Sequence, residues 1–363
     1  MNILILGNGQ LGQMLAQATI RLGHECLLVN TRTHQVMPAG AHVAMQMSIA
    51  DAVAWADVVS WEHEQLDPEH VQLAADKLLT DPSKILPLTH RQLEKKLCDD
   101  LEIATAPWVA FNTQTQFQDA IAQWQGKAVI KAASGGYDGK SQWRYDADNA
   151  GDITALADTA GRQPGIIEAM IPFQCEVSIV GARAADGRIQ CYPLVENVHR
   201  NGILSHTFAG IQAFPEHLQQ DAERAFSKIT EHLGYVGTLA IEFFIVGEGS
   251  EARLLVNEIA PRVHNSGHWS MQGANISQFA LHIRALTNMP FAPFVIQPTL
   301  MVNAIGVPHI PDSLWQDGES APFWYGKEAR PGRKVGHVNF HVNDRAGAEA
   351  LATQWASELQ ILS

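Results

Sequence analysis

Residues 129–143 read VIKAASGGYDGKSQW, and this stretch decides how the rest of the chain is interpreted. An apolar run typical of a strand ends near Lys131, which places the lysine ammonium group beside a glycine-rich loop. Gly135, Gly136 and Gly139 permit positive φ angles and close backbone approach, so amide groups of the loop can converge on an anion. The pattern favours phosphate binding, and the alternative is an ordinary glycine-rich hairpin with a surface lysine.

The loop does not follow the Walker A pattern, G-x-x-x-x-G-K-[ST]. Ser134 stands where that motif requires its first glycine, and no helix is evident directly after the loop. Residues 142–145 instead resume the alternation of a strand. The sequence therefore predicts a β-hairpin whose glycine loop forms a flap over a phosphate group.

The composition predicts a soluble globular protein of two or three domains. The chain has 363 residues, of which 46% are hydrophobic and 17% charged. The 25 basic and 38 acidic residues give a net charge of −13, which argues against a nucleic-acid partner but allows a local basic pocket.

Cysteine usage and apolar patterning point to a cytoplasmic location. The 4 cysteines are widely spaced and form no C-x-x-C pair, so neither a zinc knuckle nor a disulfide framework is indicated. The amino terminus enters a strand without a basic segment ahead of a long apolar one, and no apolar run is long enough for a membrane span. We expect no membrane partner.

Residues 3–15, ILILGNGQLGQML, combine a buried strand, a glycine turn and the start of a helix. The turn matches G-x-G-x-x-G, the dinucleotide fingerprint of a Rossmann-like βαβ unit. The second strand, residues 26–30, ends at Asn30 without the acidic residue that binds the ribose of NAD. We therefore predict a Rossmann-like unit, and an NAD-dependent oxidoreductase remains only as a remote alternative.

A short strand is expected at residues 41–43. The first domain is then expected to continue with short strands at residues 57–60 and 85–86 and to close near Pro87. Glu62 and Glu64 follow the first of these strands, at the edge where open α/β sheets present ligand groups. A functional role for either carboxylate is plausible there, and a solvated loop is the alternative.

Two acidic residues interrupt apolar strand sequence late in the chain. After a helix predicted near residues 215–233, Glu242 lies in one apolar strand and Glu258 in the next, across a short turn. Adjacent antiparallel strands would bring both carboxylates to one face, where they repel unless a cation lies between them. The pattern predicts a Mg²⁺ site, because this ion takes oxygen ligands and bridges carboxylates to phosphates; outward-facing edge acids are the alternative.

Two polar segments follow these strands. Residues 262–269, RVHNSGHW, contain a His-x3-His spacing that weakly suggests zinc, but an anion pocket explains them more economically. Residues 327–334 carry four cations in an otherwise acidic chain, which indicates a receptor for phosphate. The four are Lys327, Arg330, Arg333 and Lys334.

Four motifs in this order resemble those of the ATP-grasp superfamily and, within it, the N5-carboxyaminoimidazole ribonucleotide synthetase family. They are GNGQLG at 7–12, GGYDGK at 135–140, NEIAPRVHNSGH at 257–268 and RPGRKVGH at 330–337. The likeness covers nearly the whole chain and implies an α/β (α+β) fold of ATP-grasp architecture. It implies a Rossmann-like domain at 1–88, an ATP-grasp domain at 89–290 with a lid at about 110–170, and a small β-rich domain at 291–363 that completes the substrate site.

The resemblance also implies an activity, which is that of an ATP-dependent carbon–nitrogen ligase of purine biosynthesis. The family carboxylates the exocyclic amine of 5-aminoimidazole ribonucleotide with bicarbonate, passes through carboxyphosphate, and releases ADP and phosphate. ATP as co-substrate, Mg²⁺ and a homodimer are further family expectations. The alternatives are a sister ATP-grasp ligase that uses formate or another carboxylate on a phosphorylated amine, and a nucleotide sensor without turnover.

The resemblance assigns roles residue by residue. The ATP-binding residues would be Arg91, Lys131, Gly136, Tyr137, Asp138, Gly139, Lys140, Ser141, Gln142, Glu168, Ala169, Met170, Ile171, Glu176, His199, Asn257 and Glu258. Glu242 and Glu258 would bind Mg²⁺, and Lys131, Arg262, His264 and Asn265 would act in catalysis. The ribonucleotide would be held by Tyr137, Asp138, Arg262, His264, Lys327, Arg330, Arg333 and Lys334. Lys140 and Ser141 depart from the arginine and glycine usual in the family loop.

Overall fold

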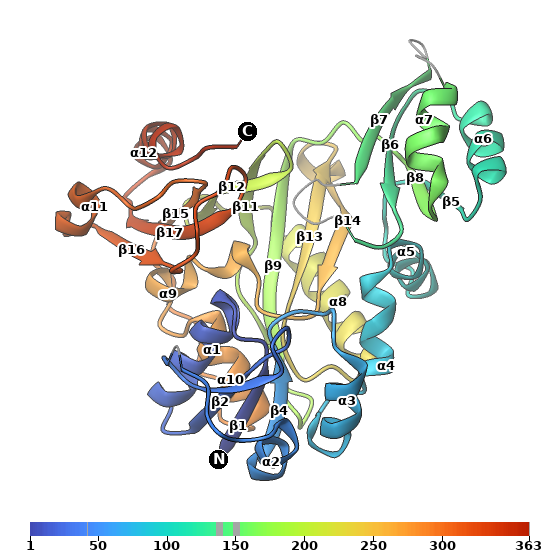
Figure 1. Cartoon of the computed structure of the whole chain (residues 1–363). Helices are drawn as coiled ribbons and strands as arrows, with labels where there is room; N and C mark the ends of the chain where they lie inside the picture. Colours follow the sequence, from blue (N-terminus) through green and yellow to red (C-terminus); the bar gives the residue numbers. More distant parts are fainter. Residues whose placement is uncertain (42, 136–140, 148–152, 363) are drawn as a thin grey trace.

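The computed structural model describes residues 1–41, 43–135, 141–147 and 153–362, which form three β-sheets (Figure 1). The amino-terminal sheet lies at the bottom of that view, a small sheet at the upper right, and the largest sheet runs between them and the carboxy-terminal segment. Within the described ranges, no helix combines the length and the apolar character needed to cross a membrane.

The amino-terminal sheet has the strand order β3-β2-β1-β4. Strand β1 pairs in parallel with β2 and β4, and β3 pairs antiparallel with β2, which confirms the Rossmann-like unit. The strands are β1 (Asn2–Leu6), β2 (Glu25–Asn30), β3 (Gln35–Pro38) and β4 (Val58–Trp61). The helices of this part are α1 (Gln10–Arg21), α2 (Ile49–Trp55), α3 (Pro68–Ala74) and α4 (Pro82–Ile85).

The short strand expected at residues 85–86 is wrong, because α4 occupies Pro82–Ile85. The side chain of Asp81 caps this helix by accepting a hydrogen bond from the backbone N–H of Ser83. Pro82 follows at the first helical position, where its missing N–H is not needed. The capping signal therefore outweighs the apolar Ile-Leu pair from which the strand was predicted. The strand expected at residues 41–43 is not formed by Ala41 and Val43, and residue 42 lies outside the described residues.

The small sheet has the order β5-β8-β6-β7 and carries two helices on one face. Its elements are β5 (Trp108–Phe111), α6 (Gln114–Gln123), β6 (Lys127–Ala132), β7 (Gln142–Asp146), α7 (Ile153–Thr159) and β8 (Gly165–Ala169). Phe111, Phe117 and Ile130 form part of its separate core. Strands β6 and β7 pair antiparallel with Lys131 opposite Gln142, as expected for a hairpin that flanks the glycine loop.

The largest sheet has the order β14-β13-β9-β11-β12-β15-β17-β16, with β10 beside β9. Its strands are β9 (Cys175–Arg183), β10 (Ile189–Cys191), β11 (Val195–Arg200), β12 (Ile203–Ala209), β13 (Gly237–Val246), β14 (Arg253–Ala260), β15 (Thr299–Ile305), β16 (Ser320–Trp324) and β17 (Lys334–His341). The accompanying helices are α5 (Arg91–Asp100), α8 (Glu216–Leu233), α9 (Ser270–Gly273), α10 (Gln278–Leu286), α11 (Asp312–Gln316) and α12 (Arg345–Glu358). The last three strands thus continue the sheet formed by the middle of the chain.

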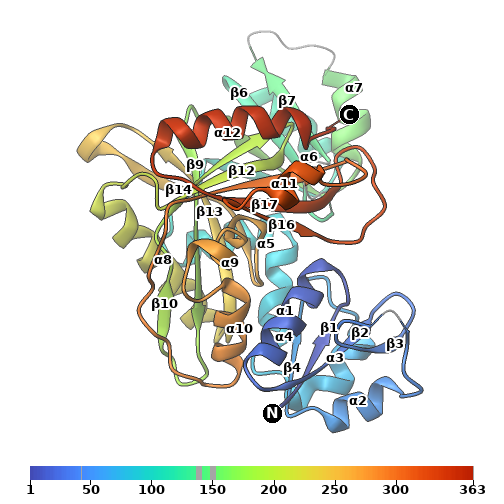
Figure 2. The same ribbon diagram turned by 90° about the vertical axis from the view of Figure 1, so that its left-hand side faces the viewer.

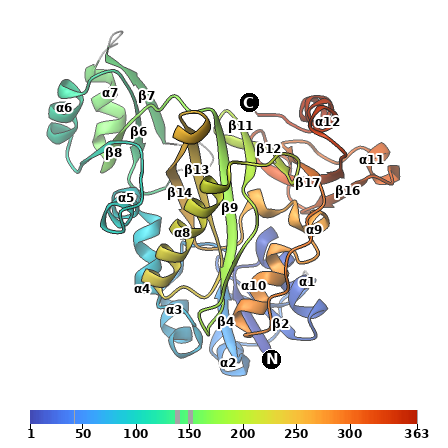
Figure 3. The same cartoon turned by 180° about the vertical axis from the view of Figure 1, so that it is seen from behind.

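Helix α8 covers one face of β9, β13 and β14 (Figure 3). On the other face, α10 packs against part of β9 and β13, and polar residues such as Glu242 occupy another part. Ile179, Ile241 and Phe243 lie in one core cluster with Phe226 of α8. Because side chains alternate along a strand, Glu242 between Ile241 and Phe243 points away from α8. On the carboxy-terminal side of the molecule, α12 packs over the sheet beside β15 and β12 (Figure 2).

Candidate active site

Glu242 of β13 and Glu258 of β14 lie directly opposite each other in the antiparallel register. Directly opposed residues share a face of the sheet, so the structure confirms the expected arrangement of the two carboxylates. Desolvation raises the pKa of Glu242 to about 7; the positive charge of His199 opposes the shift and the charge of Glu258 adds to it. Burial and the neighbouring carboxylate therefore both favour the protonated form of Glu242.

Lys131 joins the small sheet to these carboxylate strands. Its Nζ donates to Glu168 Oε1 on β8 at 2.8 Å and to Asn257 Oδ1 on β14 at 3.3 Å. Lys95 of α5 holds the other oxygen of Glu168, also at 2.8 Å. Burial by itself raises the pKa of Glu168, but the two ammonium groups more than offset this and hold it at about 2. Glu168 is therefore an ionised, buried carboxylate that fixes both lysines.

Arg91, the first residue of α5, reaches the start of the glycine loop. Its Nη1 donates to the backbone oxygens of Ala132 at 2.6 Å and Gly135 at 3.0 Å. The loop residues assigned by the resemblance, Gly136, Tyr137, Asp138, Gly139 and Lys140, lie outside the described residues. The described chain resumes at Ser141, whose φ of 58° falls in the left-handed region that favours glycine.

An ion pair between Glu176 and His199 lies on the same side of the sheet. Glu176 belongs to β9 and His199 to β11, and the two side chains are in direct contact. Burial lowers the pKa of His199, but the hydrogen bond that its imidazole donates to Glu176 and the charge of Glu242 raise it overall. The carboxylates of Glu176 and Glu242 thus favour the protonated form of the His199 imidazole.

The loop after β14 presents Arg262 and His264 toward the same region. Arg262 Nε donates to Glu64 Oε2 at 2.5 Å, which ties this loop to the end of β4. His264 Nδ1 lies 3.9 Å from Glu242 Oε1 and 2.9 Å from Ser266 Oγ. Burial and the charge of Arg262 lower the pKa of His264 well below its usual value, so this imidazole is neutral at pH 7.

Asn265 and His268 of the same segment are engaged with the core. The side-chain amides of Asn265 and Asn303 donate to each other, at 3.0 Å and 2.7 Å. His268 is buried, forms a hydrogen bond of 2.9 Å with Gln278, and packs its ring against Phe279 and His337. Among the described residues, His268 is therefore a core histidine, and the His-x3-His zinc hypothesis gains no support.

The basic segment between β16 and β17 divides into two parts. Lys334, the first residue of β17, acts electrostatically on Glu242, His199 and His264, so it lies beside the carboxylate pair. The other three basic residues precede Lys334 in the chain. Arg330 binds the exposed Glu328 carboxylate, Arg333 donates to the Glu328 backbone oxygen at 3.1 Å, and Lys327 lies 6.0 Å from the centre of the Tyr325 ring.

Glu62 fills the anion site of the first glycine turn, which sequence reasoning did not foresee. Its two carboxylate oxygens accept hydrogen bonds of 2.7 Å from the backbone N–H groups of Gly9 and Gly12. A Cβ atom at Gly7 would lie 2.2 Å from the Glu62 side chain, so a larger residue cannot be accommodated there without a shift. The turn that binds pyrophosphate in dinucleotide enzymes is here occupied by the protein's own carboxylate, which argues further against NAD binding.

Lys95, which pairs with Glu168 in this cluster, is another residue that sequence reasoning missed. It is one helical turn after Arg91 on α5, and this spacing puts both side chains on the same helix face. Since Arg91 was assigned to the ATP phosphates, its helical spacing to Lys95 could have placed Lys95 at the same site.

The fold and this cluster of lysines, carboxylates and an arginine define an ATP-grasp enzyme. The chain matches the ATP-grasp domain family over residues 96–279, the ribonucleotide synthetase preATP-grasp domain over 1–93, and the phosphoribosylaminoimidazole carboxylase C-terminal domain over 299–351. The chain belongs to the N5-carboxyaminoimidazole ribonucleotide synthase family, and it is an ATP-dependent ligase.

Individual relatives support this assignment over nearly the full length. The N5-carboxyaminoimidazole ribonucleotide synthase of Haemophilus influenzae is 39% identical, over 95% of this chain and 90% of the relative. The crystal structure of N5-carboxyaminoimidazole synthetase from Staphylococcus aureus complexed with ADP superposes with a TM-score of 0.84 at 27% identity, covering 98% and 96% of the two chains. The N5-carboxyaminoimidazole ribonucleotide synthetase of Thermus thermophilus gives a TM-score of 0.82 at 32% identity, covering 99% and 98%.

Proposed function

We propose that this chain uses ATP and bicarbonate to carboxylate the exocyclic amine of 5-aminoimidazole ribonucleotide, with release of ADP and phosphate. The product is N5-carboxyaminoimidazole ribonucleotide, an intermediate of purine biosynthesis. The observation that carries the proposal is the opposed pair Glu242 and Glu258, with Lys131 hydrogen-bonded to the neighbouring Asn257. A carboxylate pair and a lysine at one place form a suitable receptor for a metal-bound triphosphate.

The ATP molecule is assigned to the region between the small sheet and the polar face of β13 and β14. Lys131 and Arg91 would contact phosphate oxygens, together with the loop Gly136–Gln142. Residues 168–171 would hold the adenine by their backbone, because the Glu168 side chain is committed to two lysines and Met170 presents an exposed apolar side chain. Glu176, held by His199, would accept hydrogen bonds from the ribose hydroxyl groups.

Mg²⁺ is assigned to Glu242 and Glu258, with Asn257 beside them. The donor set fits this hard cation, because the two carboxylates supply oxygen ligands. Burial, followed by the charges of Glu258 and Glu176, raises the pKa of Glu242, and a bound cation would favour its ionised form. When bound, the ion neutralises the charge that develops on the phosphates. The metal-binding groups would be kept in place by the β13–β14 pairing.

The first chemical step transfers the γ-phosphoryl group to bicarbonate. A bicarbonate oxygen bonds to the γ-phosphorus while the bond to the β,γ-bridging oxygen breaks, so ADP leaves and carboxyphosphate forms. The role of Lys131 is to stabilise the charge on the transferring group by a preorganised ammonium. Glu168 keeps this ammonium in position with a hydrogen bond of 2.8 Å.

The second step delivers the carboxyl carbon to the amine, as CO₂ or its equivalent, while phosphate departs and the amine loses a proton. Arg262, anchored by Glu64, would bind the carboxyphosphate oxygens, and neutral His264 would add a hydrogen bond. Asn265 is assigned a supporting role because Asn303 already engages its amide. The ribonucleotide is assigned to Tyr137, Asp138, Lys327, Arg330, Arg333 and Lys334.

The wider organisation of the protein follows the same proposal. We assign residues 1–88 to the preceding domain, 89–290 to the ATP-grasp domain with a lid at about 110–170, and 291–363 to the part that completes the substrate site. The family matches at 1–93, 96–279 and 299–351 support these boundaries. A cytoplasmic homodimer completes the proposal, and light scattering on the purified chain tests the dimer.

One assay tests the proposed reaction: ADP release is measured with ATP, bicarbonate, Mg²⁺ and 5-aminoimidazole ribonucleotide, each left out in turn. We expect ADP formation to require all four. Formate in place of bicarbonate should give none, and a requirement for formate would contradict the proposal. ATP binding without turnover would indicate a sensor instead.

A further inference from the structure

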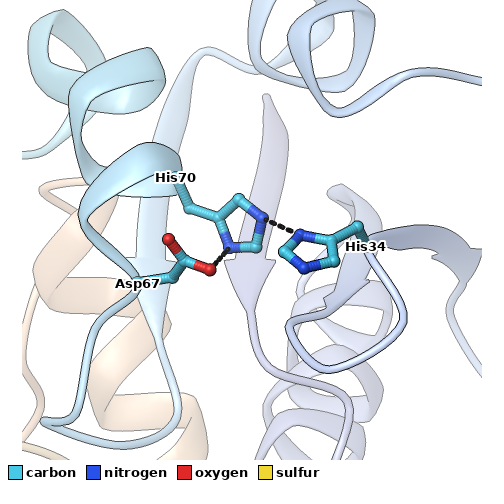
Figure 4. Close-up of side chains that lie close together, drawn as sticks. All are labelled: His34, Asp67 and His70. Carbon is cyan, nitrogen blue, oxygen red and sulfur yellow. Dashed lines mark hydrogen bonds and ion pairs between the residues drawn. The ribbon is translucent and has the colours of Figure 1, made fainter.

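A second polar cluster lies in the amino-terminal domain, formed by His34, Asp67 and His70 (Figure 4). His34 belongs to the turn between β2 and β3, and His70 lies in α3, so the cluster links two segments that are 36 residues apart. His34 Nδ1 lies 3.1 Å from His70 Nε2, and His70 Nδ1 lies 3.9 Å from Asp67 Oδ2. One donor atom from each of the three residues lies within 4.8 Å of the other two.

The facing imidazole nitrogens have the spacing that one metal ion requires. Zn–N bonds of about 2.0–2.1 Å in a tetrahedral site put two ligand nitrogens about 3.4 Å apart, close to the observed 3.1 Å. In the metal-free chain, one of these rings donates a hydrogen bond to the other. A small rotation of His34, whose side chain is exposed, would open this contact for an ion.

His70 is a buried ligand with unsatisfied hydrogen-bonding capacity. It is 2% exposed, and its Nδ1 atom has no hydrogen-bond partner among the described residues. Leaving such a polar atom unpaired in the interior is unfavourable. If Nε2 binds a metal, Nδ1 carries the proton and points it toward Asp67, an arrangement that commonly orients metal-bound histidines.

We propose that His34, Asp67 and His70 form a binding site for a divalent transition-metal ion of the Zn²⁺ type. Imidazole ligands select such ions over Mg²⁺, so the site differs in chemistry from the carboxylate pair Glu242 and Glu258. The two imidazoles bind the ion directly, and Asp67 supplies the negative charge and the orienting contact to His70. Asp67 also caps α3 by accepting from the Glu69 N–H, so its carboxylate is already fixed in place.

The expected consequence is a tether between the β2–β3 turn and α3. Asp67 and Glu64 both line an open surface pocket of about 440 Å³ that extends to Thr31 and Thr89. A bound ion would stabilise the folded state of this domain by an amount that rises with the logarithm of its free concentration once that exceeds the dissociation constant.

The test uses the full chain without a histidine tag, freed of metal by a chelator and kept reduced. ZnCl₂ binding is measured by calorimetry with excess MgCl₂ and ADP present to occupy the carboxylate site, and CoCl₂ absorption reports imidazole coordination. His34→Asn is the informative variant, because asparagine tolerates the positive φ of 53° at this position. His309→Asn, at an exposed histidine elsewhere, is the matched control.

We expect one ion per chain, a rise in melting temperature with ZnCl₂, and at least a tenfold weaker affinity in His34→Asn. The His309→Asn control should bind as the parent does, and Asp67→Asn should weaken binding by about 10-fold or more. The proposal is overturned if the parent chain binds no Zn²⁺, which would leave only a hydrogen-bonded histidine pair. It is equally overturned if His34→Asn binds as tightly as the parent, or if Glu258→Gln abolishes binding.

Discussion

Glu242 and Glu258 face each other across β13 and β14, on the side of the sheet that α8 leaves uncovered. The hairpin that joins their strands fixes this register, so the pair is set by local chain geometry. The two negative charges repel each other, and a divalent cation bound between them would attract both carboxylates and offset that repulsion. The relationship therefore links the stability of the sheet to the chemistry proposed for it.

The first prediction concerns the metal. Glu258→Gln removes one anionic ligand without changing side-chain volume, so ADP formation should fall by roughly 10²–10³-fold or more while the fold is kept. Steady-state ADP release measured against MgCl₂ concentration checks this, with circular dichroism to verify folding. Glu251→Gln, at the exposed end of the same hairpin, should behave as the parent chain does. Near-normal turnover in Glu258→Gln would show that the metal assignment is wrong.

Two neighbouring lysines on α5 provide a matched pair for stability. Lys95 binds Glu168 at 2.8 Å in the interior, and Lys96 binds Asp100 at the same distance on the surface. Lys95→Met leaves part of a buried carboxylate unpaired and should lower the free energy of unfolding by about 3 kcal/mol. Lys96→Met should leave it nearly unchanged, because this ion pair is exposed to solvent. Urea unfolding of both variants makes the comparison, and equal effects would contradict the buried ion triad.

The lowered pKa of Glu168 predicts how stability depends on pH. Its folded value of about 2 lies below its ordinary 4.5, so the unfolded chain binds the proton more tightly. The stabilisation from Glu168 is therefore fully present above pH 4.5 and is lost as the pH falls toward 2. Glu168→Gln should flatten this part of the stability curve, measured as unfolding free energy between pH 7 and pH 3. If the parent and the variant lose stability in parallel over that range, Glu168 is not the ionised partner of the lysines.

The parts of this site that are formed by neighbouring segments of the chain could be predicted from the sequence. Glu242 and Glu258 were predictable because each interrupts an apolar strand and a short turn joins the two. Lys131 was likewise predictable from the glycine loop beside it. The continuation of the sheet through β15 was not, because β12 and β15 meet through pairs such as His206 and Val302, which are far apart in the chain.

Contacts between polar residues that are far apart in the chain could not be predicted from the sequence either. The carboxylate of Glu62 reaches amides 53 and 50 residues away, and nothing in the motif distinguishes a glycine turn that binds a cofactor from one that binds a side chain. At Ser141, by contrast, the sequence did show an unusual residue, and the structure explains it. Its departure from the family glycine was visible, and the positive φ of 58° gives the physical reason why glycine is usual there.

Glu62→Gln tests the carboxylate in the glycine turn. The amide keeps one acceptor oxygen, but its NH₂ group would face a backbone N–H of Gly9 or Gly12, leaving two donors without an acceptor. The free energy of unfolding should fall by about 2–4 kcal/mol. Glu69→Gln, at an exposed position in α3, is the control and should be nearly neutral. A neutral effect of Glu62→Gln would mean that the two short hydrogen bonds contribute little.

His264 provides the last test, because its lowered pKa makes it a neutral hydrogen-bonding group at pH 7. If it holds carboxyphosphate, His264→Ala should let the intermediate react with water, so that ADP forms without an equal amount of carbamate. The ratio of ADP to carboxylated product is measured at pH 7 and pH 8, and the parent ratio should be unchanged because the imidazole stays neutral at both. His341→Ala, at an exposed position on β17, serves as the control. A one-to-one ratio in His264→Ala with normal turnover would remove His264 from the mechanism, whereas loss of both products would place it in the first step.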